Sequence, residues 1–320
     1  MIFDDIYEKI LGSNSVAIFS HMNSDADAIG SSIAMKYMLE KLGKTVSIFI
    51  QKPIHSNYDI LGVKENIDLN TNRSFDLAIS LDCPNTKRFG IYQKKFESIK
   101  NSVMFDHHSD SEYFADVCYT DSTCSSTCLM LYRFFTSKKL ELDKNIATCL
   151  YAGIASDTGR FLFANLNSEV FEAVANLYEY GFDYLKLNYE LFQKQSKNEF
   201  ELLKLAFSSM KFFENDKICM CKLDEADFKK TGTQPMDTYK VIDYMLQINE
   251  SKIAVLLSQN DTEEYLVSIR TKDDYNAQLI AKTFGGGGHL KASGCRLFTD
   301  GDTAFNELLN ACKNELYRTK

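Results

Sequence analysis

Residues 16–32 read VAIFSHMNSDADAIGSS, and three patterns follow one another in this stretch. VAIFS is an apolar run typical of a buried strand, and it ends at His21. A polar segment with two aspartates comes next, and from Gly30 an apolar periodicity closed by Gly43 predicts a helix. A second strand-like run at 45–50 completes a β-α-β unit. We therefore expect polar side chains at the point where the first strand ends.

Two further strand-like runs also end in polar residues. DLAISLDC leads to Asp82, and SVMFDHH leads to Asp106, His107 and His108. Asp157 follows the helical pattern IATCLYAGIAS, one of several helical patterns in the middle of the chain. Because ligands bind at the carboxyl ends of strands in open parallel α/β sheets, we expect these polar clusters to converge.

A second α/β region is predicted in the last third of the chain, where the pattern changes. Its strand-like runs lie at 217–223, 252–259 and 263–271, and a helical pattern at 275–284 leads into GGGGH. The fold class is therefore α/β with two domains, an N-terminal parallel-sheet domain and a smaller C-terminal domain, with a cleft between them. The bounds that we predict are 1–190 for the first domain, 191–200 for a linker and 201–320 for the second domain.

The composition is that of a folded protein without overall positive charge. Of 320 residues, 45% are apolar and 25% are charged, and 44 acidic against 36 basic residues give a net charge of −8. Such a chain lacks the basic field that attracts long duplex nucleic acid. Its nine cysteines include no pair of C-x-x-C elements, which indicates free thiols in a reducing compartment. Without a signal pattern or a run of about eighteen apolar residues, we expect a cytoplasmic protein with no membrane partner.

Histidine and aspartate, with no cysteine among them, are the candidate metal ligands. This donor set suits Mn²⁺, Mg²⁺ or Fe²⁺ better than a closed structural zinc site. The candidates are His21, Asp25, Asp27, Asp82, Asp106, His107, His108 and Asp157. These residues are too many for one ion. Two cations ~3.5–4 Å apart could share a carboxylate and bind both the attacking and the leaving oxygen of a phosphoryl transfer. The simpler alternative is that Asp25 and Asp157 only cap helices.

GGGGHLKASG at 285–294 is a second candidate site. Four successive glycines allow close approach of a ligand, and their N–H groups could bind phosphate oxygens, with His289 and Lys291 adding donors. Arg270, near the end of a predicted strand, could pair bidentately with a phosphate. The alternatives are a turn between helix and strand for the glycine run and a solvated surface position for the arginine.

Five motifs, in this order, resemble a known family. HMNSDADAIGSS, the aspartate of LAISLDC, FDHH and YAGIASDTGRF resemble the four motifs of the DHH phosphoesterase superfamily. GGGGHLKASGC resembles the signature of the C-terminal DHH-associated domain that many members carry. Size and layout are most similar to the bacterial NrnA-type enzymes, which degrade very short RNA and dephosphorylate 3′-phosphoadenosine 5′-phosphate. This sequence departs from the family pattern at Cys128 and Leu129, where relatives often have an acidic residue.

The resemblance also implies roles for individual residues. The first cation would be held by His21, Asp25 and Asp82, and the second by Asp27, Asp82, His107 and Asp157. Asp82 would bridge the two cations, His108 would face the substrate phosphate, and Asp106 would orient the histidine pair. The implied substrate-binding residues are Arg270, Gly286, Gly287, Gly288 and His289. Mn²⁺ is the usual cation of the superfamily, and Mg²⁺ or Fe²⁺ would suit the same ligands.

We therefore predict a phosphoesterase that hydrolyses nanoRNA, linear dinucleotides, 3′-phosphoadenosine 5′-phosphate or a combination of these through a hydroxide activated by two metals. Its partner would be a short RNA or nucleotide, and a homodimer is compatible with the family. The alternative enzymes are a family II inorganic pyrophosphatase and a RecJ-like single-strand exonuclease. The non-enzyme alternative is a nucleotide-binding module that has lost catalysis.

Overall fold

The predicted strands of the N-terminal region form one parallel sheet, as the β-α-β pattern indicates. Its strands are β1 (Ser15–Phe19), β2 (Thr45–Phe49), β3 (Leu77–Leu81), β4 (Ser102–Asp106) and β5 (Val117–Thr120). Their order in the sheet is β2-β1-β3-β4-β5, and every neighbouring pair is parallel. The carboxyl ends of β1, β3 and β4 therefore lie side by side at one edge.

The computed structural model describes residues 2–67, 73–163 and 165–318 of the chain. These residues divide into two units, Met1–Lys194 and Gln195–Lys320. The helices of the first unit are α1 (Ile2–Leu11), α2 (Ala26–Lys41), η1 (Ser56–Leu61), α3 (Val63–Asn66), η2 (Thr86–Tyr92), α4 (Gln93–Glu97), α5 (Thr127–Ser137), α6 (Lys144–Asp157), α7 (Ser168–Tyr178), α8 (Tyr184–Asn188) and η3 (Tyr189–Gln193).

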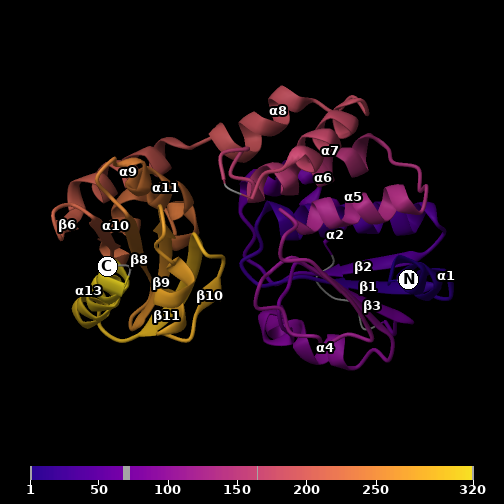
Figure 1. The fold of residues 1–320 in the computed structure, drawn as a ribbon, viewed down its shortest axis with the longest axis horizontal. Coiled ribbons are helices and arrows are strands. Elements are labelled where there is room, and N and C mark those ends of the chain that lie inside the picture. Colours follow the sequence, from indigo (N-terminus) through magenta and orange to yellow (C-terminus); the bar gives the residue numbers. More distant parts are fainter. Residues whose placement is uncertain (1, 68–72, 164, 319–320) are drawn as a thin grey trace. The chain divides into compact units, whose positions relative to one another are not determined.

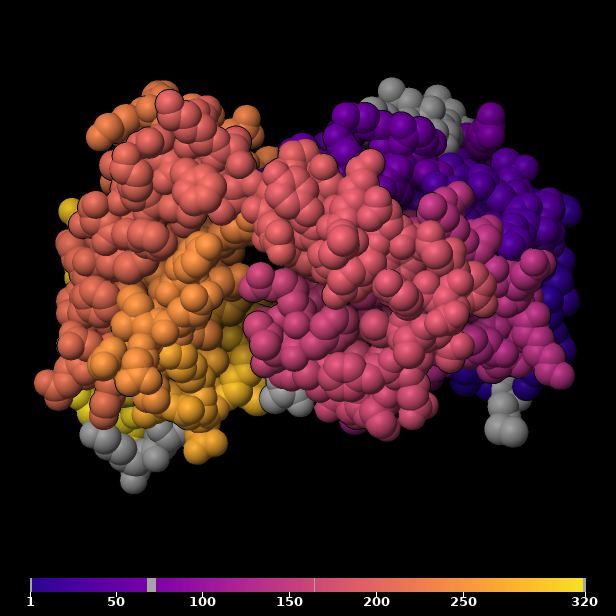
Figure 2. All heavy atoms as spheres, turned by 90° about the horizontal axis from the view of Figure 1, so that it is seen from above, coloured from indigo at the N-terminus to yellow at the C-terminus, as the bar shows by residue number. Residues whose placement is uncertain are grey.

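Helices cover both faces of the parallel sheet (Figure 1). Helices α2, α5 and α6 lie on one face, where α2 packs lengthwise against α6 and aliphatic side chains form the main core. The other face carries an aromatic cluster in which Phe19 and Phe49 of the sheet meet Phe96 of α4. The segment from α6 to η3 covers one side of this unit in the space-filling view (Figure 2). Both faces being buried explains why the strand sequences are apolar runs without alternation.

The C-terminal unit is a separate mixed sheet with its own cores. Its strands are β6 (Lys211–Phe213), β7 (Ile218–Leu223), β8 (Ile253–Asp261), β9 (Glu264–Thr271), β10 (Gly287–Gly288) and β11 (Ala292–Phe298), in the order β10-β11-β9-β8-β7-β6. Its helices are α9 (Lys197–Ser209), α10 (Glu225–Thr231), η4 (Pro235–Thr238), α11 (Tyr239–Gln247), α12 (Ala277–Lys282) and α13 (Gly301–Arg318). One core lies against α12 and α13 and the other against α9 and α11, so this sheet too is covered on both faces. The predicted two-part α/β architecture is confirmed.

Some predicted element bounds are wrong. Helix α2 begins at Ala26, four residues before the predicted start at Gly30, because Asp25 caps it. The buried, polar Asp27 interrupts the apolar periodicity there and hides the first turn. Strands β5, β6, β10 and β11 have no counterpart in the prediction. The first three are only two to four residues long, and ASGCRLF of β11 opens with small residues.

The thiols are free, as predicted. All nine cysteines are unpaired by disulfides, and each is buried except Cys118, which is half-buried. Among the helices of the described residues, none is long and apolar enough to cross a membrane.

The buried carboxylate of Glu315 allows a test of what stabilises the C-terminal unit. Its carboxylate is 4% exposed and accepts hydrogen bonds from Asn276 N–H at 2.8 Å and from Arg318 Nε at 2.7 Å. Burial raises the pKa of Glu315, but the bonds from Arg318 and Asn276 outweigh it and hold the pKa below its ordinary value of 4.5. The stabilisation is therefore present above the ordinary value and is lost as the pH falls through the lower folded pKa.

We expect Glu315→Gln to lower the free energy of unfolding at pH 7 by about 1–2 kcal/mol, as for a hydrogen bond to a charged group. The difference from the parent should shrink as the pH falls below the ordinary pKa. Urea unfolding followed by circular dichroism at pH 7 and near pH 3 measures both values. Glu307→Gln, on the exposed side of the same helix, is the matched control. A loss that is equal at both pH values would contradict the role of the charge.

Candidate metal centre

The turn from β1 into α2 places three candidate ligands. His21 lies two residues after the end of β1, and its Nδ1 lies 2.9 Å from the carbonyl oxygen of Met22. Asp25 caps α2, and its Oδ1 accepts the N–H groups of Asp27 and Ala28, each at 3.0 Å. The cap occupies one oxygen of Asp25, so the capping and the ligand interpretations of this residue are compatible. Asp27, in the first helical turn, is fully buried.

Asp82 lies at the centre of the cluster. It follows β3, the strand between β1 and β4, and its backbone has a φ of 55°, in the left-handed region that Asp and Asn tolerate better than most residues. Its Oδ2 is 3.4 Å from His21 Nε2, and its Oδ1 is 3.5 Å from His107 Nε2. Oδ1 is also 3.8 Å from His108 Nδ1. One buried carboxylate therefore faces all three imidazoles.

The DHH triplet at the end of β4 orients two histidines. His107 Nε2 lies 3.1 Å from an oxygen of Asp157, the last residue of α6. His108 Nδ1 lies 2.8 Å from Asp106 Oδ1, and the hydroxyl of Ser111 donates to the other oxygen of Asp106. Asp106 is fully buried, so its hydrogen bonds hold the ring of His108 in one orientation.

Among the groups of described side chains that could each hold a cation, two share Asp82 and consist of ligands that the resemblance implies. One is His21, Asp25 and Asp82, and the other is Asp27, Asp82 and His107, with the candidate ligand atoms of each group within 4.8 Å of one another. Asp157 adjoins the second group through His107. Asp82 belongs to both groups, which is the arrangement that a shared carboxylate requires. Oxygen and imidazole donors without thiolate suit Mn²⁺ or Mg²⁺, so the residues present fit a pair of divalent cations.

The pKa values of three aspartates in the cluster are shifted by burial and by neighbouring charges. Burial, with the charges of Asp82 and Asp157, raises the pKa of Asp27 well above its ordinary value. Burial also raises the pKa of Asp157, to about 6. For Asp82, burial acts in the same direction, but hydrogen bonds from His107 and His21 outweigh it and hold the pKa low. The raised pKa values of Asp27 and Asp157 show that these two carboxylates are crowded by negative charge and burial, which a bound cation would relieve.

The start of α5 contains site residues that sequence reasoning missed. The N–H groups of Thr127 and Cys128 donate to the two oxygens of Asp27 at 2.7 and 2.9 Å. The hydroxyl of Thr127 donates to Asp82 Oδ1 at 3.1 Å. The sequence STCLMLYRFF at 126–135 has a helical pattern, but nothing in that pattern indicates which side chains the start of the helix faces.

Cys128 and Gly153 enclose Asp27. Cys128 is fully buried, and its Sγ lies 3.7 Å from the carbonyl oxygens of both Asp27 and Cys149. A Cβ added to Gly153 would overlap Cys128 Sγ and Asp27 Oδ1. A neutral, compact side chain therefore fills the position where relatives often have an acidic one.

The predicted substrate residues lie in the C-terminal unit. Arg270, on β9, is half-buried, and its Nε is 3.8 Å from an oxygen of Asp243 on α11. Arg270 pairs with Ala292 of β11, and β11 in turn pairs with β10 of the glycine run. A Cβ on Gly286 would overlap the backbone of β11, so packing alone requires glycine at this position. The structure therefore brings Arg270 and the run Gly286–His289 into one sheet.

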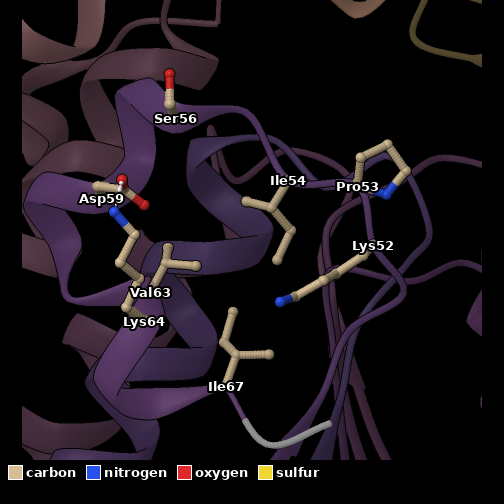
Figure 3. A pocket seen from close by; sticks show the side chains of 8 residues that line it. All are labelled: Lys52, Pro53, Ile54, Ser56, Asp59, Val63, Lys64 and Ile67. Atoms are coloured by element: carbon tan, nitrogen blue, oxygen red, sulfur yellow. Dashed lines mark ion pairs between the residues drawn. The ribbon is translucent and has the colours of Figure 1, made fainter.

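A cavity of about 650 Å³ lies beyond the carboxyl end of β2 (Figure 3). Its lining residues are Lys52, Pro53, Ile54, Ser56, Asp59, Val63, Lys64 and Ile67. Lys64 Nζ pairs with Asp59 Oδ2 at 2.6 Å. With its one carboxylate paired and no imidazole among these residues, the cavity does not resemble a metal site.

Comparisons with known proteins identify both units. Residues 15–154 match the DHH family, N-terminal domain, and residues 215–317 match the DHHA1 domain. The chain combines a DHH domain with a DHHA1 domain. It is 26% identical over 318 residues to the probable bifunctional oligoribonuclease and PAP phosphatase NrnA of Streptococcus mutans, covering 97% of this chain and 99% of that relative.

Solved structures share the fold of these two domains. An exopolyphosphatase-related protein from Bacteroides fragilis aligns with a TM-score of 0.89 at 22% identity, over 99% of this chain and 97% of that one. RecJ of Thermus thermophilus in complex with Mn²⁺ aligns with a TM-score of 0.56 at 14% identity, over 98% of this chain and 54% of that one.

Replacing Gly153 by alanine should disturb the site without removing a candidate ligand. We expect Gly153→Ala to lower the free energy of unfolding by about 1–3 kcal/mol, as overpacking does. Cys128→Ala vacates the space of Sγ, so the double variant should lose less stability than the sum of the single variants. Urea unfolding of the parent and the three variants measures this coupling. Additive losses would show that the two side chains do not compete for space.

Proposed function

We propose that the chain is a metal-dependent phosphoesterase that hydrolyses short oligoribonucleotides, 3′-phosphoadenosine 5′-phosphate, or both. The chain is a hydrolase of the phosphoester class, as its DHH domain and its NrnA relative indicate. The observation that carries the finer proposal is the position of Asp82, whose carboxylate belongs to both groups of candidate ligands. Such sharing is typical of sites that bind two divalent cations.

Each side chain of the cluster receives a role in this proposal. His21, Asp25 and Asp82 would hold one cation, and Asp27, Asp82, His107 and Asp157 would hold the other. Bound cations, with Mn²⁺ as our choice, would stabilise charge on the phosphate and lower the pKa of water. His108, held by Asp106 at 2.8 Å, would donate to a substrate phosphate oxygen through its Nε2.

The DHHA1 domain would bind the part of the substrate that does not react. Arg270 offers a guanidinium on the sheet that also carries the glycine run, Gly286, Gly287 and Gly288, followed by His289. These groups suit a phosphate or a terminal nucleotide. The net charge of −8 gives no overall positive field to attract a long strand, so substrates of a few nucleotides are favoured.

A panel of substrates tests the function. We expect Mn²⁺-dependent hydrolysis of a diribonucleotide or of 3′-phosphoadenosine 5′-phosphate, loss of activity in EDTA, and slow turnover of an RNA of about twenty nucleotides. Asp82→Asn should reduce every activity to background while keeping the left-handed backbone, which Asn tolerates. Preferred hydrolysis of pyrophosphate would instead favour the pyrophosphatase alternative. Equal rates on long and short RNA would favour the RecJ-like exonuclease.

The substitution Arg270→Ala tests whether Arg270 binds the non-reacting part of the substrate or acts at the reacting phosphate. On a dinucleotide, kcat/KM should fall ~10-fold or more, as for a charge-assisted contact. On bis-p-nitrophenyl phosphate, which has no second nucleotide to hold, turnover should change little. Arg296→Ala is the matched control, because Arg296 of β11 is exposed and pairs with Glu264 at 2.7 Å. Equal losses on both substrates would place Arg270 at the reacting phosphate.

A further inference from the structure

The first two residues of α5 bind the carboxylate of Asp27, which lies about 100 residues earlier in the chain. Asp27 Oδ2 accepts the N–H of Thr127 at 2.7 Å, and Oδ1 accepts the N–H of Cys128 at 2.9 Å. All three residues are fully buried, and Thr127 is 100 residues away from Asp27 in the chain. The unpaired N–H groups of a helix start are natural partners for an anion, so here a side chain of the protein itself takes that position.

Thr127 contacts a second carboxylate through its side chain. Its Oγ1 donates to Asp82 Oδ1 at 3.1 Å, so its backbone and its hydroxyl bind two different aspartates. One of them, Asp82, is the carboxylate common to both groups of candidate ligands. Thr127 therefore fixes the relative positions of Asp27 and Asp82.

Further contacts position the start of α5. Ser126 caps the helix by accepting the N–H of Leu129 at 3.0 Å, which fixes its first turn. The thiol of Cys128 lies 3.7 Å from the carbonyl oxygens of Asp27 in α2 and of Cys149 in α6. The backbone at Thr127 is therefore positioned by contacts other than its hydrogen bond to Asp82.

We infer that Thr127 is a positioning residue of the metal centre, whose hydroxyl holds Asp82 in the orientation that binds cations. The inference rests on the proposed function, since it requires that Asp82 bind metal. The hydroxyl acts through the carboxylate and does not itself contact substrate. It holds one oxygen of Asp82 in place against the repulsion of neighbouring carboxylates, so its loss should weaken cation binding.

The experiment compares two substitutions of one side chain in the full-length protein. Thr127→Val keeps the branched shape and the backbone N–H but removes the hydroxyl, whereas Thr127→Ser keeps the hydroxyl. Thr231→Val is the matched control, since Thr231 is also a buried helix residue and its hydroxyl donates to Asp227 O at 2.8 Å in the other unit. Calorimetric titration of the metal-free proteins with MnCl₂ gives stoichiometry and affinity. Thermal unfolding in EDTA and hydrolysis of a dinucleotide at limiting and saturating Mn²⁺ complete the measurements.

We expect Thr127→Val to weaken Mn²⁺ binding about 10- to 100-fold, in the range of lost outer contacts at metal sites. Thr127→Ser and Thr231→Val should bind Mn²⁺ like the parent. The unfolding midpoint of Thr127→Val in EDTA should stay within about 5 °C of the parent, the size of one lost hydrogen bond. Saturating Mn²⁺ should restore most of kcat, because the hydroxyl acts on metal occupancy.

Two results would overturn the inference and leave the proposed function standing. In the first, Thr127→Val binds Mn²⁺ as tightly as a parent that binds two ions. In the second, Thr127→Ser loses as much affinity as Thr127→Val, which would show that packing and not the hydroxyl matters. A parent protein that binds no divalent cation would instead overturn the proposed function and this inference together.

Discussion

Repulsion between buried carboxylates is the constraint on which the DHH domain depends. Asp27 and Asp82 are both buried, and Asp157 lies beside them, so ionising all three without partners would be costly. Imidazoles and backbone N–H groups offset part of this cost, as the distances from His107 and from the start of α5 indicate. A cluster of this kind is unfavourable by itself and becomes favourable when cations bind. We therefore expect divalent cations, if they bind to this cluster, to raise the free energy of unfolding of the DHH domain.

Strand order decides which residues share the cluster. Because β3 lies between β1 and β4, the residue after β3 meets side chains from both neighbours. Asp82 is that residue, with His21 on one side and His107 on the other. Strand β2 is at the edge of the sheet, and the cavity beyond its carboxyl end is lined by lysines and aliphatic side chains. The central position of β3 is the structural reason for assigning the shared carboxylate to Asp82.

The DHHA1 domain has a different organisation, with a mixed sheet in place of a parallel one. Its mixed sheet has separate cores on its two faces, so it does not depend on the DHH domain for its own packing. The glycine run closes on β11, and packing already requires Gly286 to lack a side chain.

The sequence by itself determined the two α/β regions, the strands that end in polar residues and the residue types, aspartate and histidine, that are the candidate metal ligands. Each of these follows from local pattern, since an apolar run reports the burial of its own segment. The sequence did not reveal the first turn of α2, because the buried residue Asp27 is polar. Its polar partners are the N–H groups of Thr127 and Cys128, which belong to another helix. Only the tertiary structure decided that Thr127 meets Asp27 and Asp82, residues 100 and 45 positions away. Such contacts depend on strand order and helix placement, which local periodicity does not encode.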